Sequence, residues 1–195
     1  IIGGGAIDDA LARELKSFPN HVWSTYGMTE TLSHIALRRL NGTDASDWYT
    51  PFENVSIRLS KEGTLIINAP NVCPEELITN DIAEINAEGK FRILGRKDNT
   101  INSGGVKIQI EQVEAALKAH LDIPFQITAR KDGKFGEIVV LIYNKEGNEA
   151  SIRQVCEATL PTYWVPKAYI AVDELPMTGT GKPDRATARR MANNA

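Results

Sequence analysis

The feature that most constrains the fold is a short charged segment, Gly95-Arg96-Lys97-Asp98-Asn99, which separates two different hydrophobic patterns. Before it, short apolar stretches separated by glycine turns predict mainly strands, whereas after it helical patterns alternate with strands. Each side therefore has its own set of elements, and 195 residues are enough for two unequal domains. We place the boundary at Asp98, so the predicted domains are residues 1–97 and 98–195.

The first part of the chain is predicted to be the end of a parallel α/β sheet unit followed by a β-barrel-like hairpin region. Apolar residues at helical spacing predict a helix over residues 7–18, with a strand before and after it, which is the order of a parallel crossover unit. From about Asn41 the pattern changes. Alternating residues at 55–59, and apolar stretches that follow Glu62-Gly63 and Glu88-Gly89, predict hairpins.

The second part is predicted to be a small α+β C-terminal domain of about 100 residues. Apolar residues at helical spacing predict helices over 113–121 and 152–160, and continuous apolar stretches predict strands over 138–142 and 168–172. A glycine-rich loop and a basic helix follow the last strand. The predicted fold class of the chain is therefore α/β plus α+β.

Composition disfavours several classes of function. Lys and Arg number 22 against 25 Asp and Glu, so the net charge of -3 argues against nonspecific nucleic-acid binding. No apolar stretch approaches the roughly 20 residues that span a bilayer, and we expect no signal peptide. Cys73 and Cys156 lie far apart without a Cys or His cluster, so neither a disulfide framework nor a zinc site is expected. These properties predict a cytoplasmic protein.

Two segments near the N-terminus could bind a nucleotide. Gly3-Gly4-Gly5-Ala6 could let a flat ligand or a phosphate approach the backbone, but it is also typical of a tight turn. Residues 24–31 follow a strand, where ligands of open α/β sheets bind. There Tyr26 could stack on a base and Glu30 could hold Mg²⁺, the alternative being a polar loop with a helix-capping threonine.

Each of three later segments has a purely structural interpretation, and two of them could also bind a ligand or take part in a reaction. Asp81 and Arg96 could bind the two hydroxyls of a ribose, or they could form a surface ion pair. Asn102-Ser103-Gly104-Gly105 is most simply a hairpin turn. Lys182 ends a glycine-rich loop over residues 175–182, and it is either a solvated charge or a cation that the loop brings to a reaction.

The order of these segments resembles the motif order of the adenylate-forming superfamily, which includes acyl-CoA synthetases, amino-acid adenylating domains and luciferases. In chain order the motifs are Gly3-Gly4-Gly5-Ala6, Thr25-Tyr26-Gly27-Met28-Thr29-Glu30, Thr79-Asn80-Asp81, Gly95-Arg96-Lys97-Asp98 with Gly104-Gly105 and Glu111-Gln112-Val113-Glu114, and residues 176–182. The resemblance implies that residues 1–97 are the C-terminal part of a large nucleotide-binding domain. Residues 98–195 would be a mobile lid domain with its hinge at Asp98.

The same resemblance implies a role for each motif in ATP-dependent activation of a carboxylate and its transfer to CoA. Thr29 would contact the α-phosphate, Glu30 would coordinate Mg²⁺, and Lys182 would bridge carboxylate and phosphate, so these three are the expected catalytic residues. Gly104 and Gly105 would line the path of the CoA arm. The expected nucleotide-binding residues are Gly4, Gly5, Ala6, Thr25, Tyr26, Gly27, Thr29, Asp81, Arg96 and Lys182.

Residues 26–34 are further similar to the corresponding stretch of o-succinylbenzoate-CoA ligases of menaquinone biosynthesis. Ser33 and His34 would then either touch a polar acyl substrate or flank a helix. One departure is Asn80, which stands where the family usually has glycine. The family's pyrophosphate-binding loop is expected upstream of Ile1, which predicts that the chain is part of a longer enzyme.

Four functions fit these motifs. An ATP-dependent acyl-CoA ligase is favoured, with ATP, Mg²⁺ and CoA required and a small-molecule carboxylate as substrate. The alternatives are an amino-acid or aryl-acid adenylating domain that loads a carrier protein, an oxygen-consuming luciferase-like enzyme, and a noncatalytic nucleotide-binding module. We expect neither a nucleic-acid partner nor a membrane span, and a homo-oligomer is compatible with each function.

Overall fold

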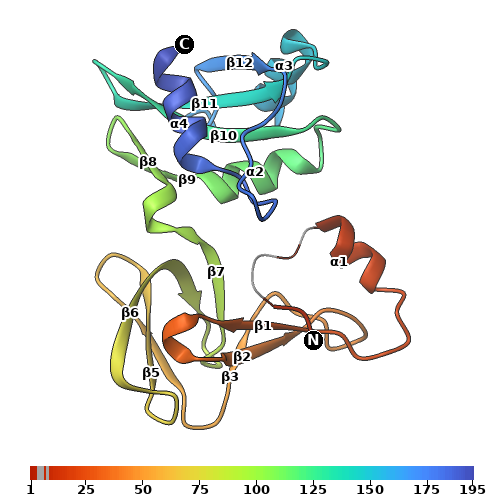
Figure 1. Ribbon diagram of the computed structural model, residues 1–195, viewed down its shortest axis with the longest axis vertical. Helices are drawn as coiled ribbons and strands as arrows, with labels where there is room; N and C mark the ends of the chain where they lie inside the picture. Colours follow the sequence, from red (N-terminus) through yellow and green to blue (C-terminus); the bar gives the residue numbers. More distant parts are fainter. Residues whose placement is uncertain (4–6, 8) are drawn as a thin grey trace. The chain divides into compact units, whose positions relative to one another are not determined.

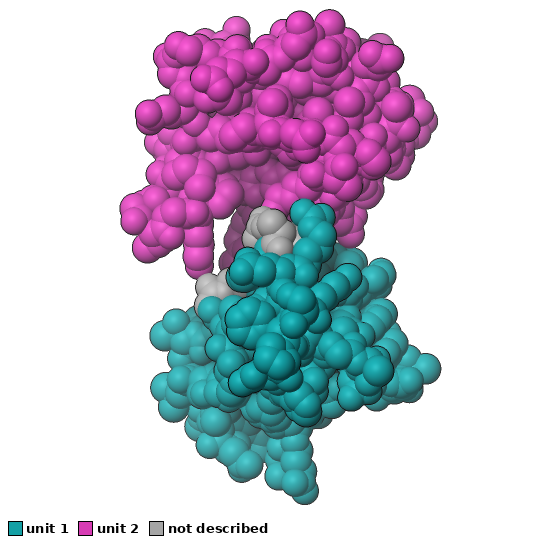
Figure 2. Space-filling view, turned by 90° about the vertical axis from the view of Figure 1, so that its right-hand side faces the viewer, with its two compact units in different colours: residues 1–94 teal, residues 95–195 magenta. Residues whose placement is uncertain are grey.

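The computed structural model describes residues 1–3, 7 and 9–195. It divides into two compact units, residues 1–94 and residues 95–195 (Figure 2). Each unit contains β-sheet, and helices are few, so the chain has a mixed α/β fold. The predicted nucleotide-binding residues Gly4, Gly5 and Ala6 lie outside the described residues.

The first unit, unit 1, contains one short α-helix and two sheets (Figure 1). Its elements are α1 (Asp9–Leu15), β1 (Trp23–Gly27), the 3-10 helix η1 (Thr29–Thr31), β2 (His34–Arg39), β3 (Thr50–Pro51), β4 (Ser56–Leu59), β5 (Thr64–Ala69), β6 (Cys73–Ile85) and β7 (Phe91–Arg96). One sheet has the order β1-β2-β3 and the other the order β4-β5-β6-β7. The final two residues of β7 belong to the second unit.

Unit 1 confirms the predicted hairpin region but not a barrel. Strand β5 pairs antiparallel with both β4 and β6, in a four-stranded sheet whose order follows the sequence. The predicted parallel crossover unit is reduced to a single parallel bridge between Ile2 and Ser24, because β1 otherwise pairs antiparallel with β2.

The first helix is shorter than predicted, since α1 ends at Leu15 rather than at Phe18. The backbone N–H of Lys16 donates to the Arg13 carbonyl at 3.2 Å, a three-residue spacing that tightens the chain and ends the helix. The hydroxyl of Ser17 also donates to the Glu14 carbonyl at 2.9 Å. Side-chain capping therefore competes with the apolar periodicity and stops the helix early.

The core of unit 1 is shared by its two sheets. Ile35 of β2, Leu65 and Ile67 of β5, and Phe91 of β7 are fully buried in one cluster. Tyr49 and Phe91 also exchange backbone hydrogen bonds of 2.7 and 3.0 Å in an antiparallel bridge. Because strands of both sheets contribute to the same apolar cluster, the positions of β1 and β6 are fixed relative to each other within this unit.

The second unit, unit 2, consists of one five-stranded sheet with three α-helices (Figure 1). Its elements are η2 (Lys97–Asn99), β8 (Thr100–Ser103), β9 (Val106–Gln109), α2 (Ile110–Lys118), β10 (Phe125–Asp132), β11 (Gly136–Asn144), α3 (Glu149–Thr159), β12 (Ala168–Val172) and α4 (Arg185–Asn194). The strand order is β10-β11-β8-β9, with β12 paired parallel to β11.

Strand β11 organises the core of unit 2. Residues 139, 141 and 143 pack on the side of α2 and α3, and residues 138, 140 and 142 pack against Ala188 and Ala192 of α4. Side chains alternate between the two faces of a strand, so a strand covered on both faces is apolar at every position. This explains the uninterrupted apolar stretch that predicted the strand, and it confirms that prediction. Among the described helices, none is long and apolar enough to cross a membrane.

Candidate functional site

Tyr26 of β1 and Asp81 of β6 meet in unit 1 although 55 residues separate them. The phenol oxygen of Tyr26 donates a hydrogen bond of 2.5 Å to Oδ2 of Asp81. The Tyr26 ring packs edge-on against Phe91, with 5.1 Å between the ring centroids. Both side chains are half-buried. The structure therefore brings together two of the residues predicted to bind a nucleotide.

The backbone at Asp81 is held in place by its neighbour Thr79. The buried hydroxyl of Thr79 donates to the Leu65 carbonyl at 2.8 Å and accepts from the backbone N–H of Asp81 at 3.1 Å. This hydroxyl bonds across to β5 in a region where the pairing of β5 and β6 changes register. Strand β6 is thus tied to the core at the residue before Asn80, and Asp81 follows directly.

Thr29 and Glu30 lie exposed on the short 3-10 turn after β1. The turn is closed by Thr31, whose buried hydroxyl accepts from the Met28 N–H at 3.1 Å and contacts the Ser33 carbonyl at 2.6 Å. A threonine does fix this loop, but it is Thr31 and no α-helix follows. Thr29 and Glu30 are therefore presented to solvent by a turn that other residues hold.

Of the two interpretations of Ser33 and His34, the helix flank is wrong. His34 begins strand β2, which pairs antiparallel with β1. The neighbouring Leu32 has a left-handed backbone with φ of 57°, and such a conformation reverses the chain instead of starting a helix. Antiparallel pairing with β1, and not helical periodicity, decides the structure here.

Gly27 has a local structural reason to be glycine. A β-carbon at this position would lie 2.7 Å from the Cα of His34 and still closer to the Ser33 carbonyl. The pairing of β1 and β2 is irregular between Tyr26 and Gly27, and this irregularity allows the two strands to approach each other so closely. The preceding Thr25 stays in the regular ladder, and its N–H donates to the Ile2 carbonyl at 2.9 Å.

Arg96 and Asp98 lie at the beginning of unit 2 and face each other. One Nη of Arg96 is 3.5 Å from Oδ2 of Asp98, and the two side chains are 52% and 63% exposed. Such an exposed ion pair contributes little to stability. Because Asp81 belongs to unit 1 and Arg96 to unit 2, their shared role at a ribose stays a prediction, as does the hinge at Asp98.

Gly104 and Gly105 form the predicted hairpin turn. They connect β8 to β9 between the paired residues Ser103 and Val106, with φ values of 59° and 87°. Two successive positive φ angles define the tight hairpin turn in which glycine is favoured at both positions. The N–H of Gly104 also donates to the Phe135 carbonyl at 2.8 Å. Turn geometry alone therefore accounts for both glycines, and their role toward CoA stays a prediction.

Lys182 is exposed on a loop that closes on itself. The Lys182 carbonyl accepts from the Thr178 N–H at 2.7 Å, and its own N–H donates to the Thr178 hydroxyl at 3.1 Å. At the base of the loop, Met177 and Pro183 form a bridge, and the Asp184 N–H donates to the Pro176 carbonyl at 2.9 Å. The glycine-rich segment is thus a hydrogen-bonded hairpin.

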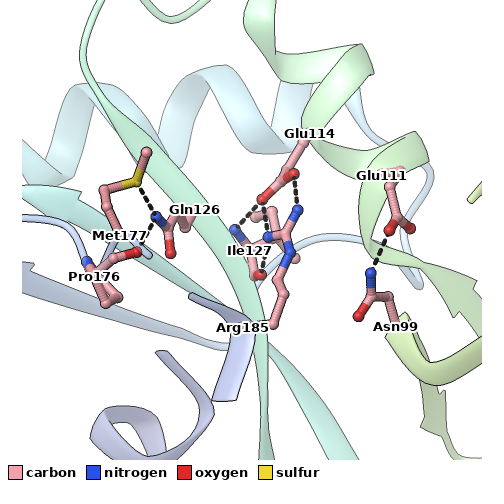
Figure 3. Close-up of polar contacts among 8 residues, drawn as sticks. All are labelled: Asn99, Glu111, Glu114, Gln126, Ile127, Pro176, Met177 and Arg185. Atoms are coloured by element: carbon pink, nitrogen blue, oxygen red, sulfur yellow. Dashed lines mark hydrogen bonds and ion pairs between the residues drawn. The ribbon is translucent and has the colours of Figure 1, made fainter. Parts of the chain in front are cut away.

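An ion pair behind this loop was not predicted from the sequence. Both terminal nitrogens of Arg185 donate to the carboxylate of Glu114, each at 2.6 Å, and the side chains are 24% and 14% exposed (Figure 3). Burial by itself would lower the pKa of the Arg185 guanidinium, but the hydrogen bonds and charge of Glu114, with a smaller effect of Glu111, raise it overall. Arg185 is therefore a fixed charge.

Gln126 was also missed. It is a polar residue of strand β10, only 2% exposed, and its amide donates to the Pro176 carbonyl at 2.9 Å (Figure 3). Gln126 and Thr128 alternate with apolar residues along β10, a pattern that predicts an exposed polar face, so no local signal marked the buried amide. For Arg185 the signal was Asp184 after a proline, which is typical of a helix start.

Glu30 is the predicted metal ligand, and its exposed carboxylate offers the hard oxygen that Mg²⁺ prefers. The described part of the chain contains no group of three or more His, Cys, Asp or Glu side chains that could hold a metal ion. Mg²⁺ commonly uses one or two carboxylates together with substrate phosphates, so a single glutamate is compatible with such binding.

Part of unit 2 matches a known protein family. Residues 112–182 match the family described as the AMP-binding enzyme C-terminal domain. The matched residues all lie within the second unit. This finding confirms the resemblance to adenylate-forming enzymes that the motif order indicated.

Relatives and solved structures extend the similarity to the rest of the chain. A 2-succinylbenzoate-CoA ligase of Bacillus cereus is 29% identical over 220 residues, covering 98% of this chain and 46% of that ligase. An acyl-CoA synthetase (AMP-forming)/AMP-acid ligase II-like protein of Dyadobacter fermentans is 31% identical, with a TM-score of 0.52 over 95% of this chain and 55% of that one. The o-succinylbenzoate CoA synthetase of Bacillus subtilis, in complex with its acyl-adenylate intermediate, shares the fold, with 24% identity and a TM-score of 0.77 over 95% of this chain and 44% of that one. The chain spans about half the length of the curated relatives that it matches.

Proposed function

We propose that this chain forms the C-terminal part of an ATP-dependent acyl-CoA ligase that activates a carboxylate as an acyl-adenylate and transfers the acyl group to CoA. The observation that carries the proposal is the 2.5 Å contact between Tyr26 and Asp81. These residues come from separate motifs, and their meeting places an aromatic ring beside a carboxylate, as a base and a ribose require. The similarity of unit 2 to AMP-binding enzyme C-terminal domains supports the same function.

In the first half-reaction, a carboxylate attacks the α-phosphate of ATP, so two anions approach each other, and pyrophosphate leaves as the acyl-adenylate forms. A lysine ammonium near both groups would stabilise the developing charge, which is the proposed role of Lys182. The hydroxyl of Thr29 would donate a hydrogen bond to the α-phosphate, and Glu30 would bind Mg²⁺. Bound Mg²⁺ would neutralise phosphate charge.

In the second half-reaction, the CoA thiol must reach the acyl carbon of the acyl-adenylate, where it forms the thioester and releases AMP. We place the domain boundary and hinge at Asp98, so that residues 98–195 act as a mobile lid on residues 1–97. Rotation there would withdraw Lys182 and present Gly104 and Gly105, whose lack of side chains leaves room for the CoA arm. Arg96, next to this hinge, would bind the ribose together with Asp81.

The test compares the two half-reactions in the full-length ligase that contains this chain. Lys182→Ala should lower the rate of acyl-adenylate formation, followed by pyrophosphate exchange, by roughly 10² to 10³ because one electrostatic stabiliser is lost. Thioester formation from supplied acyl-adenylate and CoA should barely change. The matched control is Lys145→Ala, which removes an exposed lysine paired with Asp173 and should leave both rates unchanged. Equal loss of both half-reactions in Lys182→Ala would contradict the proposed division of labour.

The proposed acyl substrate is o-succinylbenzoate, as used in menaquinone biosynthesis. Its support is that relatives bearing the name 2-succinylbenzoate-CoA ligase align with 95% or more of this chain. Another relative is named a medium/long-chain-fatty-acid-CoA ligase, and it aligns with 57% of the chain at 35% identity. Pyrophosphate exchange with o-succinylbenzoate or with a medium-chain fatty acid separates the two, and activity with the fatty acid alone would exclude the aromatic substrate.

A further inference from the structure

The base of the Lys182 loop is held at both ends by neighbouring residues of one strand. At the first end, the Gln126 amide donates to the Pro176 carbonyl at 2.9 Å and contacts the Met177 sulfur at 3.4 Å. At the other end, Arg185 donates to the Ile127 carbonyl at 3.2 Å. Gln126 and Ile127 are consecutive in β10, so the start and the end of the loop are attached to adjacent points of the central sheet (Figure 3).

Glu114 ties this arrangement to helix α2. Its carboxylate binds both terminal nitrogens of Arg185 and also accepts the N–H of Ile127 at 2.8 Å. A bidentate arginine–carboxylate contact fixes the relative orientation of the two side chains as well as their distance. Helix α2, strand β10 and the first residue of α4 are therefore joined at one point, three residues after Lys182.

The ends of the loop are thus rigid, whereas Lys182 itself is exposed. The bonds between Thr178 and Lys182 transmit this rigidity along the loop. Gln126 is only 2% exposed, and its Oε1 has no hydrogen-bond partner among the described residues. A buried amide whose oxygen has no hydrogen-bond partner destabilises the fold. The hydrogen bond that this amide donates to the base of the Lys182 loop therefore gives a reason for a glutamine at this position.

We propose that Gln126, Glu114 and Arg185 are positioning residues for Lys182. They hold both ends of its loop, so that the ammonium is presented with little reorganisation when the adenylation step begins. This inference rests on the proposed function of Lys182. A fixed loop lowers the cost of orienting a catalytic group, and a displacement of about 1 Å can cost up to roughly 10²-fold in rate.

The first measurement is hydrogen exchange in the 195-residue chain, which does not depend on activity. Gln126→Met removes the amide donor while filling nearly the same volume. We expect the Thr178 and Asp184 amides, which close the loop, to exchange about tenfold faster, the effect of losing one hydrogen bond. Amides of β11 should remain protected, which shows that the fold is intact. Unchanged exchange in the loop would overturn the proposed anchoring.

The second measurement is the rate of each half-reaction in the full-length ligase. Gln126→Met should lower acyl-adenylate formation by about tenfold and leave thioester formation from supplied acyl-adenylate unchanged. Arg185→Lys keeps the charge but loses the bidentate contact with Glu114. It should therefore also slow acyl-adenylate formation without slowing thioester formation, even if Gln126→Met folds poorly. A general loss of structure would lower both half-reactions together and would overturn the inference.

Lys182→Ala, measured in parallel, separates failure of this inference from failure of the proposed function. If Lys182→Ala slows adenylation while Gln126→Met frees the loop without slowing it, the positioning role is wrong and the proposed function stands. If Lys182→Ala leaves adenylation unchanged, the proposed function of Lys182 is wrong, and the positioning role is lost with it.

Discussion

The Arg185–Glu114 pair should contribute measurably to the stability of unit 2. Arg185→Met removes both 2.6 Å hydrogen bonds to the Glu114 carboxylate, whose side chain is 14% exposed. Of the hydrogen bonds to Glu114 drawn in Figure 3, the one from the Ile127 N–H then remains. Breaking a fully buried pair costs about 3–5 kcal/mol, and an exposed pair costs up to about 1 kcal/mol. Because Arg185 is 24% exposed, we expect a loss of about 2–3 kcal/mol.

A double-mutant cycle tests whether this energy comes from the pair. Glu114→Leu alone leaves a guanidinium without its carboxylate and removes the acceptor of the Ile127 N–H, so it should be the more harmful single change. In the double variant no unpaired charge remains, and the lost Ile127 bond should account for about 1–2 kcal/mol. The double variant should therefore be more stable than the sum of the two single losses by at least about 1 kcal/mol.

The assay is native-state hydrogen exchange of the β11 amides, because the central strand of a sheet reports the unfolding of its own unit. Lys145→Met, which removes an exposed ion pair with Asp173, is the control and should change little. If the two single losses add to within about 0.5 kcal/mol of the double variant, the residues act independently, and the interpretation of the pair as a structural link is refuted.

Three further predictions concern single residues. Gly27→Ala should destabilise unit 1 by about 1–3 kcal/mol, because its β-carbon would lie 2.7 Å from the His34 Cα, and an unchanged urea midpoint would contradict this. Because the φ angle of Gly105 is 87°, Gly105→Asn should preserve the hairpin, whereas Gly105→Val should strain it. Both variants should slow thioester formation if the CoA arm passes here. A slower reaction in the valine variant alone would indicate turn strain instead. Hydrogen bonds from the Thr187 hydroxyl and N–H lower the pKa of Asp184, so its stabilising effect is present above the ordinary carboxyl pKa of 3.8 and is lost as the pH falls through the lower folded pKa. Asp184→Asn should keep the helix cap without this acid dependence, and equal acid sensitivity in thermal melts of both proteins would argue against it.

Elements specified by local chemistry were predicted well. The two-glycine turn, the continuous apolar strand β11 and the periodic helices α2 and α3 all follow from residues close together in sequence. The prediction failed where a local alternative was nearly as favourable. At Ser33 and His34 a polar start suggested a helix, but pairing with β1 makes the segment a strand. In α1 a serine bond to a carbonyl ended the helix before the apolar pattern ended.

The candidate site needed contacts between distant parts of the chain. The sequence indicated Tyr26 and Asp81 separately, but only the packing of two sheets across a shared core brings them to 2.5 Å. Asn41 is a similar case, because it marked only a change of pattern in the sequence. In the structure its buried amide accepts from the Val22 N–H at 3.0 Å and donates to the Phe18 carbonyl at 3.1 Å, which holds the segment before β1.

The motifs, their order and the local turns could be recognised from the amino-acid sequence, because they depend on side-chain chemistry and on spacing over a few residues. The sequence also identified Lys182 as a candidate without showing what supports it. The contact of Glu114 with Arg185, 71 residues away, and that of Gln126 with the Pro176 carbonyl depend instead on how the chain folds in three dimensions. Partners at such separations are chosen by the topology of the sheet and the burial of polar groups that must be satisfied, and no local pattern records that choice.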